Sequence, residues 1–284
     1  MLFLAATDFS TRSQRAVRRA GLLAQAYGAE LALVHVVDDD QPQDLVALET
    51  REAQRILNEQ ITVVSELQHV TCRSLVVAGD AFDGILRTAG SIQPDLIVMG
   101  AHRKQLLLDI FVGTTIERVI RNGSWPVLMV NKEGQDSYRA ALAAIDTSEA
   151  SANAIRTAKA LKIAGDAHLT FVHAFHPMAK GQMFVAGLSK AAIDGHVGEE
   201  RVRATKDVVE ILGANGVDAY GPSLFVEEGT PFEVIKSAVE RLRPDLLVVG
   251  THARTGLTKA FLGSVSEEAL RSLEIDILAV PPKR

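Results

Sequence analysis

A glycine, a Gly-Ser pair and the helical pattern after them have the spacing of a phosphate-binding site. The apolar run Leu246–Val249 predicts a buried strand, and Gly250 after it allows a sharp turn. Gly263-Ser264 then opens an amphipathic helical pattern. Because a helix start presents free N–H groups and the positive end of its dipole, this stretch predicts an anion site. Ser264-x-x-Glu267 is also a capping box, with which a helix satisfies its own first N–H groups, and this alternative stays open.

A carboxylate follows the first predicted strand in each half of the chain. These carboxylates are Asp8 and Asp146, and the second predicted strands end at Val36 and Ala174. In an open parallel sheet, ligands bind outside the carboxyl ends of the strands. A carboxylate, a small apolar wall and a phosphate cradle together suit a nucleotide. Each aspartate is equally suited to a turn or a helix cap, so its role stays open.

Histidines lie close to the same predicted sites. His102 and His252 follow the glycine turns without an evident partner acid, so we expect them to pack or to contact a ligand and not to act in catalysis. His173-x-x-His176 spans a strand end and has no third ligand nearby in the sequence. We therefore predict no metal site there.

The elements that must position these residues occur twice. Pro94-Asp95-Leu96 recurs 150 positions later as Pro244-Asp245-Leu246, and Gly113 recurs as Gly263 at the same offset. For the two aspartates upstream the offset is 138, so the second copy holds 150 − 138 = 12 extra residues, which we place within 175–196. The sequence therefore predicts a duplicated domain, spanning residues 1–133 and 138–284.

Within each copy, predicted strands alternate with predicted helices. This order is typical of a parallel sheet covered by helices on both faces. The first copy is expected to have strands at Leu2–Ala6, Leu31–Val37, Thr71–Val77, Leu96–Met99 and Val127–Val130, and helices at about 11–27, 44–68, 82–90 and 115–121. The second is expected to have strands at Ala140–Ile145, Leu169–Ala174, Ala219–Val226, Leu246–Val249 and Ile275–Val280, and helices at about 150–164, 232–242 and 265–272 with a long helical region ending near Leu212.

Composition narrows the class of protein. The chain has 284 residues, of which 47% are hydrophobic, and a net charge of −5, which argues against a general nucleic-acid binder. Cys72 is the single cysteine, which fits a reducing compartment, and no apolar stretch is long enough to span a membrane. The N-terminus is predicted to be a first strand and not a signal peptide, so we expect a cytoplasmic protein. We interpret the arginines of the first helix as a solvated face: Arg12, Arg15, Arg18 and Arg19.

Three segments together resemble the universal stress protein family in its tandem two-domain form. They are ATDFSTRS at the first strand, LVHVVD at the second, and G-x2-A-x9-G-S from Gly250 to Ser264, which is similar to the family's G-x2-G-x9-G-(S/T) nucleotide motif. The resemblance implies an α/β fold of two tandem five-stranded, parallel, open-sheet domains of the adenine nucleotide alpha hydrolase-like kind. It implies that these domains pack as a pseudo-dimer, with Val127–Val130 against Ile277–Val280, and it leaves open whether two chains form a homodimer. It also implies binding of ATP or AMP, with Mg²⁺ left open.

Both copies depart from that motif. In the second copy Ala253 replaces the middle glycine, and Arg254 and Lys259 supply positive charge. In the first, Arg103 stands at the middle-glycine position and Asp109 replaces the equivalent of Lys259, and a carboxylate near a triphosphate is unfavourable. We therefore predict nucleotide in the second half and leave the first half undecided.

The predicted ligand-binding residues come from both copies. They are Asp146, Ala174, Gly250, Thr251, His252, Ala253, Arg254, Gly263, Ser264 and Val265 in the second copy and Asp8, Val36, Gly100, Gly113 and Thr114 in the first.

Three functions are compatible with this sequence. The first is a nucleotide-binding stress or regulatory protein with little or no turnover, and the second is a slow ATP hydrolase or a related enzyme. No P-loop, HxGH-type pair or SGGxDS-type loop supports the enzyme. The third is a ligand-free interaction module built on the paired domains.

Overall fold

The computed structural model describes residues 1–101, 114–134, 136–163, 168–217, 223–251 and 262–282. In the first half, strands and helices alternate as the sequence predicts. The elements of this half are β1 (Leu2–Ala6), α1 (Thr11–Tyr27), β2 (Glu30–Val37), α2 (Gln43–Val63), the short 3-10 helix η1 (Ser65–Leu67), β3 (Cys72–Ala78), α3 (Ala81–Ile92), β4 (Leu96–Gly100), α4 (Thr115–Asn122) and β5 (Val127–Val130).

The second half repeats this order of strands and α-helices and adds one short α-helix. Its elements are β6 (Ala140–Ala144), α5 (Glu149–Ala160), β7 (His168–Phe175), α6 (Lys180–Val185), α7 (Lys190–Ala214), β8 (Leu224–Glu228), α8 (Pro231–Leu242), β9 (Leu246–Gly250), α9 (Ser264–Ser272) and β10 (Asp276–Val280). The division into domains at 1–133 and 138–284 stays a prediction.

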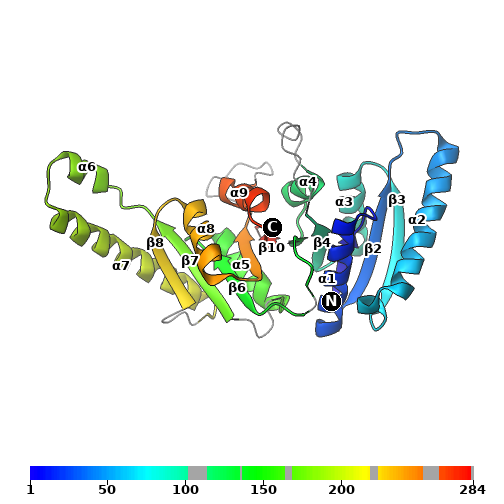
Figure 1. The fold of residues 1–284 in the computed structure, drawn as a ribbon, viewed down its shortest axis with the longest axis horizontal. Coiled ribbons are helices and arrows are strands. Elements are labelled where there is room, and N and C mark those ends of the chain that lie inside the picture. Colours follow the sequence, from blue (N-terminus) through cyan, green and yellow to red (C-terminus); the bar gives the residue numbers. More distant parts are fainter. Residues whose placement is uncertain (102–113, 135, 164–167, 218–222, 252–261, 283–284) are drawn as a thin grey trace.

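All the described strands form one continuous sheet (Figure 1), in the order β3-β2-β1-β4-β5-β10-β9-β6-β7-β8. Within each half the strands are parallel. The halves meet where β5 pairs with β10 in antiparallel register, with Leu128 opposite Leu278. Because β5 and β10 are equivalent strands, their antiparallel pairing relates the halves as a pseudo-dimer. The predicted contact between the two last strands is therefore confirmed.

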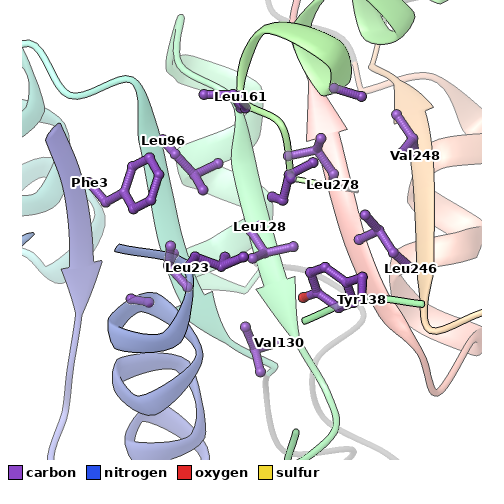
Figure 2. Packing of buried hydrophobic residues seen from close by; sticks show 14 of the residues in the cluster. Phe3, Leu23, Leu96, Leu128, Val130, Tyr138, Leu161, Leu246, Val248 and Leu278 are labelled. Atoms are coloured by element: carbon purple, nitrogen blue, oxygen red, sulfur yellow. The ribbon is translucent and has the colours of Figure 1, made fainter. Parts of the chain in front are cut away.

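Alternate residues of each strand enter two separate cores, one on each face of the sheet. In β1, Phe3 and Ala5 join the core under α1 and α5, whereas Leu4 joins the core under α3, α4, α8 and α9. Both cores continue across the junction of the halves. Figure 2 shows this for the first core, where Leu128 and Leu278 extend from neighbouring strands.

The extra residues of the second half form α6 and the beginning of α7. These helices extend beyond β8, at the edge of the sheet (Figure 1). The largest differences from prediction are at two helix ends: α2 ends at Val63 and not near residue 68, and α5 ends at Ala160 and not near Ala164. The predicted start of the strand β8, at Ala219, lies outside the described residues.

Buried charges hold the junction together. Asp276, 1% exposed, accepts hydrogen bonds from the backbone N–H of Asn131 at 2.8 Å, that of Lys132 at 3.0 Å and the hydroxyl of Tyr138 at 2.7 Å. Its carboxylate also pairs with Arg19 of α1 at 3.5 Å, and this guanidinium lies over the Tyr138 ring. The interpretation of Arg19 as part of a solvated face is therefore wrong, since Arg19 is 5% exposed. The partner of Arg19 is Asp276 on β10, which is distant in the sequence, so the local pattern of arginines gives no sign of this contact.

We expect the Tyr138 hydroxyl to make the protein sensitive to alkaline pH. Burial, and next the Asp276 carboxylate, raise the pKa of Tyr138 well above its usual value. As the pH rises, the unfolded chain therefore loses this proton before the folded protein does. The contribution of Tyr138 to the free energy of unfolding is complete below about pH 10 and falls by up to about 1.4 kcal/mol per pH unit above it. Urea unfolding between pH 8 and 11 should show this slope, and Tyr138→Phe should remove it while Tyr27→Phe keeps it. An unchanged slope in Tyr138→Phe would contradict this origin.

Candidate functional site

Each half has a cavity at the carboxyl ends of its strands. The first has a volume of about 240 Å³ and the second about 150 Å³. The first is lined by Ala6, Thr7, Asp8, Ser10, Arg12, Ser13, Val34, Val36, Ala81, Ile85, Met99, Gly100, Ala101, Thr115 and Ile116. The second is lined by Ala144, Ile145, Asp146, Ser148, Ser151, Val172, His173, Ala174, Pro231, Ile235, Val249, Gly250 and Gly263–Ser266.

The aspartate after the first strand of each half is held by serines at the start of the next helix. Asp146 Oδ1 accepts hydrogen bonds from the Ser148 N–H at 2.9 Å and from the hydroxyls of Ser148 and Ser151, the latter at 2.7 Å. Asp8 Oδ1 accepts from the Ser10 N–H at 3.0 Å. Both aspartates thus brace a turn and also line a cavity, so the two interpretations are compatible.

The Asp8 carboxylate favours its charged form. Burial by itself would raise the pKa of Asp8, but hydrogen bonds from Ser10 and Ser13 outweigh burial and hold the pKa below its usual value. Asp8 therefore offers an anionic acceptor to the first cavity at neutral pH.

Gly100 and Gly250 are required by close packing of the backbone. A Cβ at Gly250 would lie 2.8 Å from the Ala150 carbonyl oxygen, and one at Gly100 would lie 2.6 Å from that of Arg12. Neither glycine has a positive φ. The expectation that Gly250 allows a sharp turn stays a prediction, because the residues from 252 to 261 lie outside the described ranges. The missing side chain lets the first turns of α5 and α1 approach the ends of β9 and β4, which brings Asp146 and Asp8 to the cavities.

The helices that begin beside the two cavities, α4 and α9, are capped differently. In α4, Thr114 is the N-cap: its hydroxyl accepts from the Glu117 N–H at 3.3 Å, and Glu117 Oε2 accepts from the Thr114 N–H at 3.1 Å. In α9, Gly263 is the N-cap and has no side-chain cap bond, so the capping box predicted for Ser264 is wrong. The helix begins one position earlier than the capping box requires, which places Ser264 inside the first turn.

The structure brings together most of the predicted residues that it describes. Asp8, Val36 and Gly100 line the first cavity, and Asp146, Ala174, Gly250, Gly263, Ser264 and Val265 line the second. Thr114 caps α4, and Thr251, 1% exposed, donates its N–H to the Val280 carbonyl behind the second cavity. His252, Ala253, Arg254 and Gly113, like His102, lie outside the described residues.

Sequence reasoning missed several residues that line the cavities. Ser13 and Ser151 recur at the same 138-residue offset as the aspartates, which is a signal that could have identified them. Ser266 was missed because its hydroxyl donates to the Gly250 carbonyl, at 2.7 Å, a contact made across the fold.

His35 and His173 hold equivalent places in the two halves. The ring Nδ1 of each lies 2.8 Å from a backbone carbonyl, that of Thr7 or that of Ile145. Within the described ranges, no three His, Cys, Asp or Glu side chains gather as metal ligands would. None of the helices described there has the length and apolar character needed to cross a bilayer.

The fold and its cavities define a class: a tandem pair of α/β open-sheet domains, each with a cavity at the carboxyl ends of its strands. The model of the Universal stress protein family matches residues 2–131 and again residues 137–281. The chain therefore belongs to the universal stress protein family, in a tandem arrangement.

Individual relatives agree with this assignment. Universal stress protein E of Escherichia coli K12 is 26% identical over 211 residues, a match that covers 71% of this chain but only 65% of the relative, less than two thirds of its length. A universal stress protein of Archaeoglobus fulgidus has a crystal structure that aligns with a TM-score of 0.73 at 18% identity, covering 99% of this chain and 98% of that one. A putative universal stress protein of Pseudomonas aeruginosa aligns with a TM-score of 0.67 at 20% identity, covering 99% and 93%. At these identities the structures show the shared fold.

Proposed function

We propose that this protein binds an adenine nucleotide, ATP or AMP, in the cavity of its second half and acts as a regulatory protein of the cytoplasm. One observation carries the proposal: the start of α9 opens on that cavity, and among the described residues no side chain caps it. Gly263, Ser264 and Val265 all line the cavity at this point. Amides without an internal acceptor at the positive end of a helix favour a phosphate group.

The rest of the cavity suits the base and the sugar. Ala174, Ile235 and Val249 provide apolar surface for a flat heterocycle, and Asp146 provides a carboxylate acceptor for hydroxyl groups. The apolar wall and the helix start therefore divide the cavity into two regions, as a nucleotide requires.

The described lining residues favour binding over turnover. Asp146 is already held by two serines, and the His173 Nδ1 is engaged by the Ile145 carbonyl. A general base must reach the proton that it removes, and these contacts hold both groups in structural roles. We accordingly place the protein among ligand-responsive regulators, with weak ATP hydrolysis as the upper limit of activity. The single cysteine, Cys72, supports the cytoplasm as its compartment.

Calorimetric titration with ATP tests the proposal through a matched pair of variants. Ala174→Phe fills the wall of the second cavity, and Val36→Phe makes the same kind of change at the equivalent place in the first. We expect Ala174→Phe to weaken ATP binding about tenfold or more, because the added ring overpacks the site, and Val36→Phe to leave it unchanged.

Mass spectrometry of ligand released from natively purified protein provides an independent test. An adenine nucleotide should be released by the wild type and lost in Ala174→Phe. If neither method detects a nucleotide, the alternative of a ligand-free interaction module is supported instead.

A further inference from the structure

One helical hairpin exposes more large apolar side chains than any other part of the described chain. This α6–α7 hairpin consists of α6 and the first part of α7, residues 180–203, and extends beyond β8 at the edge of the sheet (Figure 1). No residue of α6 is buried, and in the first part of α7 only Ile193 is. More than half of the exposed large apolar side chains among the described residues lie on the hairpin or directly before it: Met178, Phe184, Val185, Leu188 and Val202. An exposed group of this kind marks a surface that binds a partner.

The face of α7 opposite Ile193 is apolar, and most of its side chains are small. Ala191, Gly195, Gly198 and Val202 recur at the spacing of one helix face, and all of them are exposed. A Cβ at either glycine would have no heavy atom within 4 Å. Packing within the chain therefore does not require glycine here, although glycine weakens a helix relative to alanine. Small residues on this face instead allow the axis of a second helix to approach closely.

The charges beside this face have both signs. Asp194 and Arg201 lie along one edge of it, two helical turns apart, and Glu199 lies along the other. All three side chains are exposed, and neither Asp194 nor Arg201 forms an ion pair with another described residue. The carboxylates disfavour an anionic membrane or a nucleic acid as the partner. A partner with the reverse order of charges fits better, and the same helix running in the opposite direction has that order.

A single antiparallel register matches both the small residues and the charges. When Gly195 of one α7 lies opposite Gly198 of another, Ala191 lies opposite Val202. In that register of two helices, the flanking Asp194 of each chain lies beside Arg201 of the other. A twofold axis repeats every such contact, so two ion pairs form on either side of the glycines.

We propose that the α6–α7 hairpin is a dimerisation surface, and that it binds the same hairpin of a second copy of this chain about a twofold axis between Gly195 and Gly198. Because the helices are antiparallel, the tip residues Phe184 and Val185 extend the contact toward the later turns of the second copy's α7. These two side chains are 76% and 87% exposed in the single chain, so the contact removes apolar surface from water. No residue of the hairpin lines either cavity, so this inference is independent of the proposed nucleotide.

Sedimentation velocity of the full-length chain over a dilution series tests the proposal by exchanging charges. Arg201→Asp and Asp194→Arg each place like charges opposite one another twice, so each should weaken the dimer about tenfold or more. The double variant, Asp194→Arg with Arg201→Asp, restores opposite charges between the chains and should dimerise like the wild type. A role within one chain does not predict this rescue, because the two side chains are two turns apart on the same helix.

A second variant tests the close approach of the helices. Gly198→Leu inserts a side chain between them and should weaken the dimer about tenfold or more, although leucine is the better helix former. Gly90→Leu is its control, at an exposed position of α3 where a Cβ has no heavy atom within 4 Å. Arg203→Asp is the control for charge, since Arg203 lies outside the proposed contact and pairs with Glu200 at 2.7 Å. Both controls should dimerise like the wild type, and circular dichroism checks that every variant is folded.

The possible results separate the partners. A wild-type chain that stays monomeric at every concentration would overturn the proposal and leave the hairpin to a different partner. A dimer that is as stable in Arg201→Asp and Gly198→Leu as in the wild type would show that the copies pair through another surface. A folded double variant that fails to dimerise would contradict the antiparallel register. Failure of the proposed function changes none of these results, because calorimetry with ATP reports on the second cavity alone.

Discussion

Asp276→Asn is expected to destabilise the protein by about 3–5 kcal/mol, because it leaves a buried guanidinium without its counter-charge. All the groups around Asp276 are donors: the N–H of Asn131 and of Lys132, the Tyr138 hydroxyl and the Arg19 guanidinium. An amide NH₂ at this position would have to point at one of them. Urea unfolding at pH 7 measures the loss.

Asp245→Asn is the control for this substitution. Asp245 accepts the Arg139 N–H at 2.8 Å in an exposed position, so the same chemical change should cost less than about 1 kcal/mol. If Asp276→Asn cost no more than this control, the buried cluster would not be what fastens β10 to α1 and to Tyr138.

Gly250→Ala should both destabilise the fold and weaken ATP binding. The new Cβ would lie 2.8 Å from the Ala150 carbonyl oxygen and 2.9 Å from its carbon, both backbone atoms that yield only if the start of α5 moves. Overpacking of this kind costs about 1–3 kcal/mol. The same movement displaces Asp146, so we expect calorimetry to show about tenfold weaker ATP binding.

Gly90→Ala makes the identical substitution where there is space. No heavy atom lies within 4 Å of a Cβ at Gly90, which is exposed within α3. Alanine is the better helix former, so this variant should be as stable as the wild type or more so. Equal behaviour of the two variants would show that the close approach at Gly250 has no energetic consequence.

Much of the fold followed from local patterns in the sequence. β1 and β5 have the predicted bounds, and α1 spans Thr11–Tyr27 as predicted. Its caps, Ser10 and Gly28, act within one turn of the helix, so such bounds can be predicted from the local sequence. The left-handed φ of 63° at Gly28 suits glycine. The tandem arrangement followed from the repeat, since equal spacing of the same residue types implies equal structure.

Features that depend on distant contacts could not be predicted. The burial of Arg19 depends on Asp276, which belongs to the other half of the chain, and the need for glycine at position 250 depends on α5. The unused capping box at Ser264 reflects a shift of one residue in the start of α9, whereas the equivalent box at Thr114 is formed. This shift is what makes the helix start at the second cavity differ from that at the first, and the sequence motif contains no signal for it.

The backbone amides of α9 provide the most direct test of the account. In a nuclear magnetic resonance titration with ATP, the amide signals of Ser264 and Val265 should shift strongly, because they lie at the uncapped helix start. Those of Thr115 and Ile116, at the equivalent start of α4 beside Glu117, should stay in place. If millimolar ATP moved none of these signals, or moved the α4 signals instead, the proposal that the second half binds the nucleotide at the start of α9 would be contradicted.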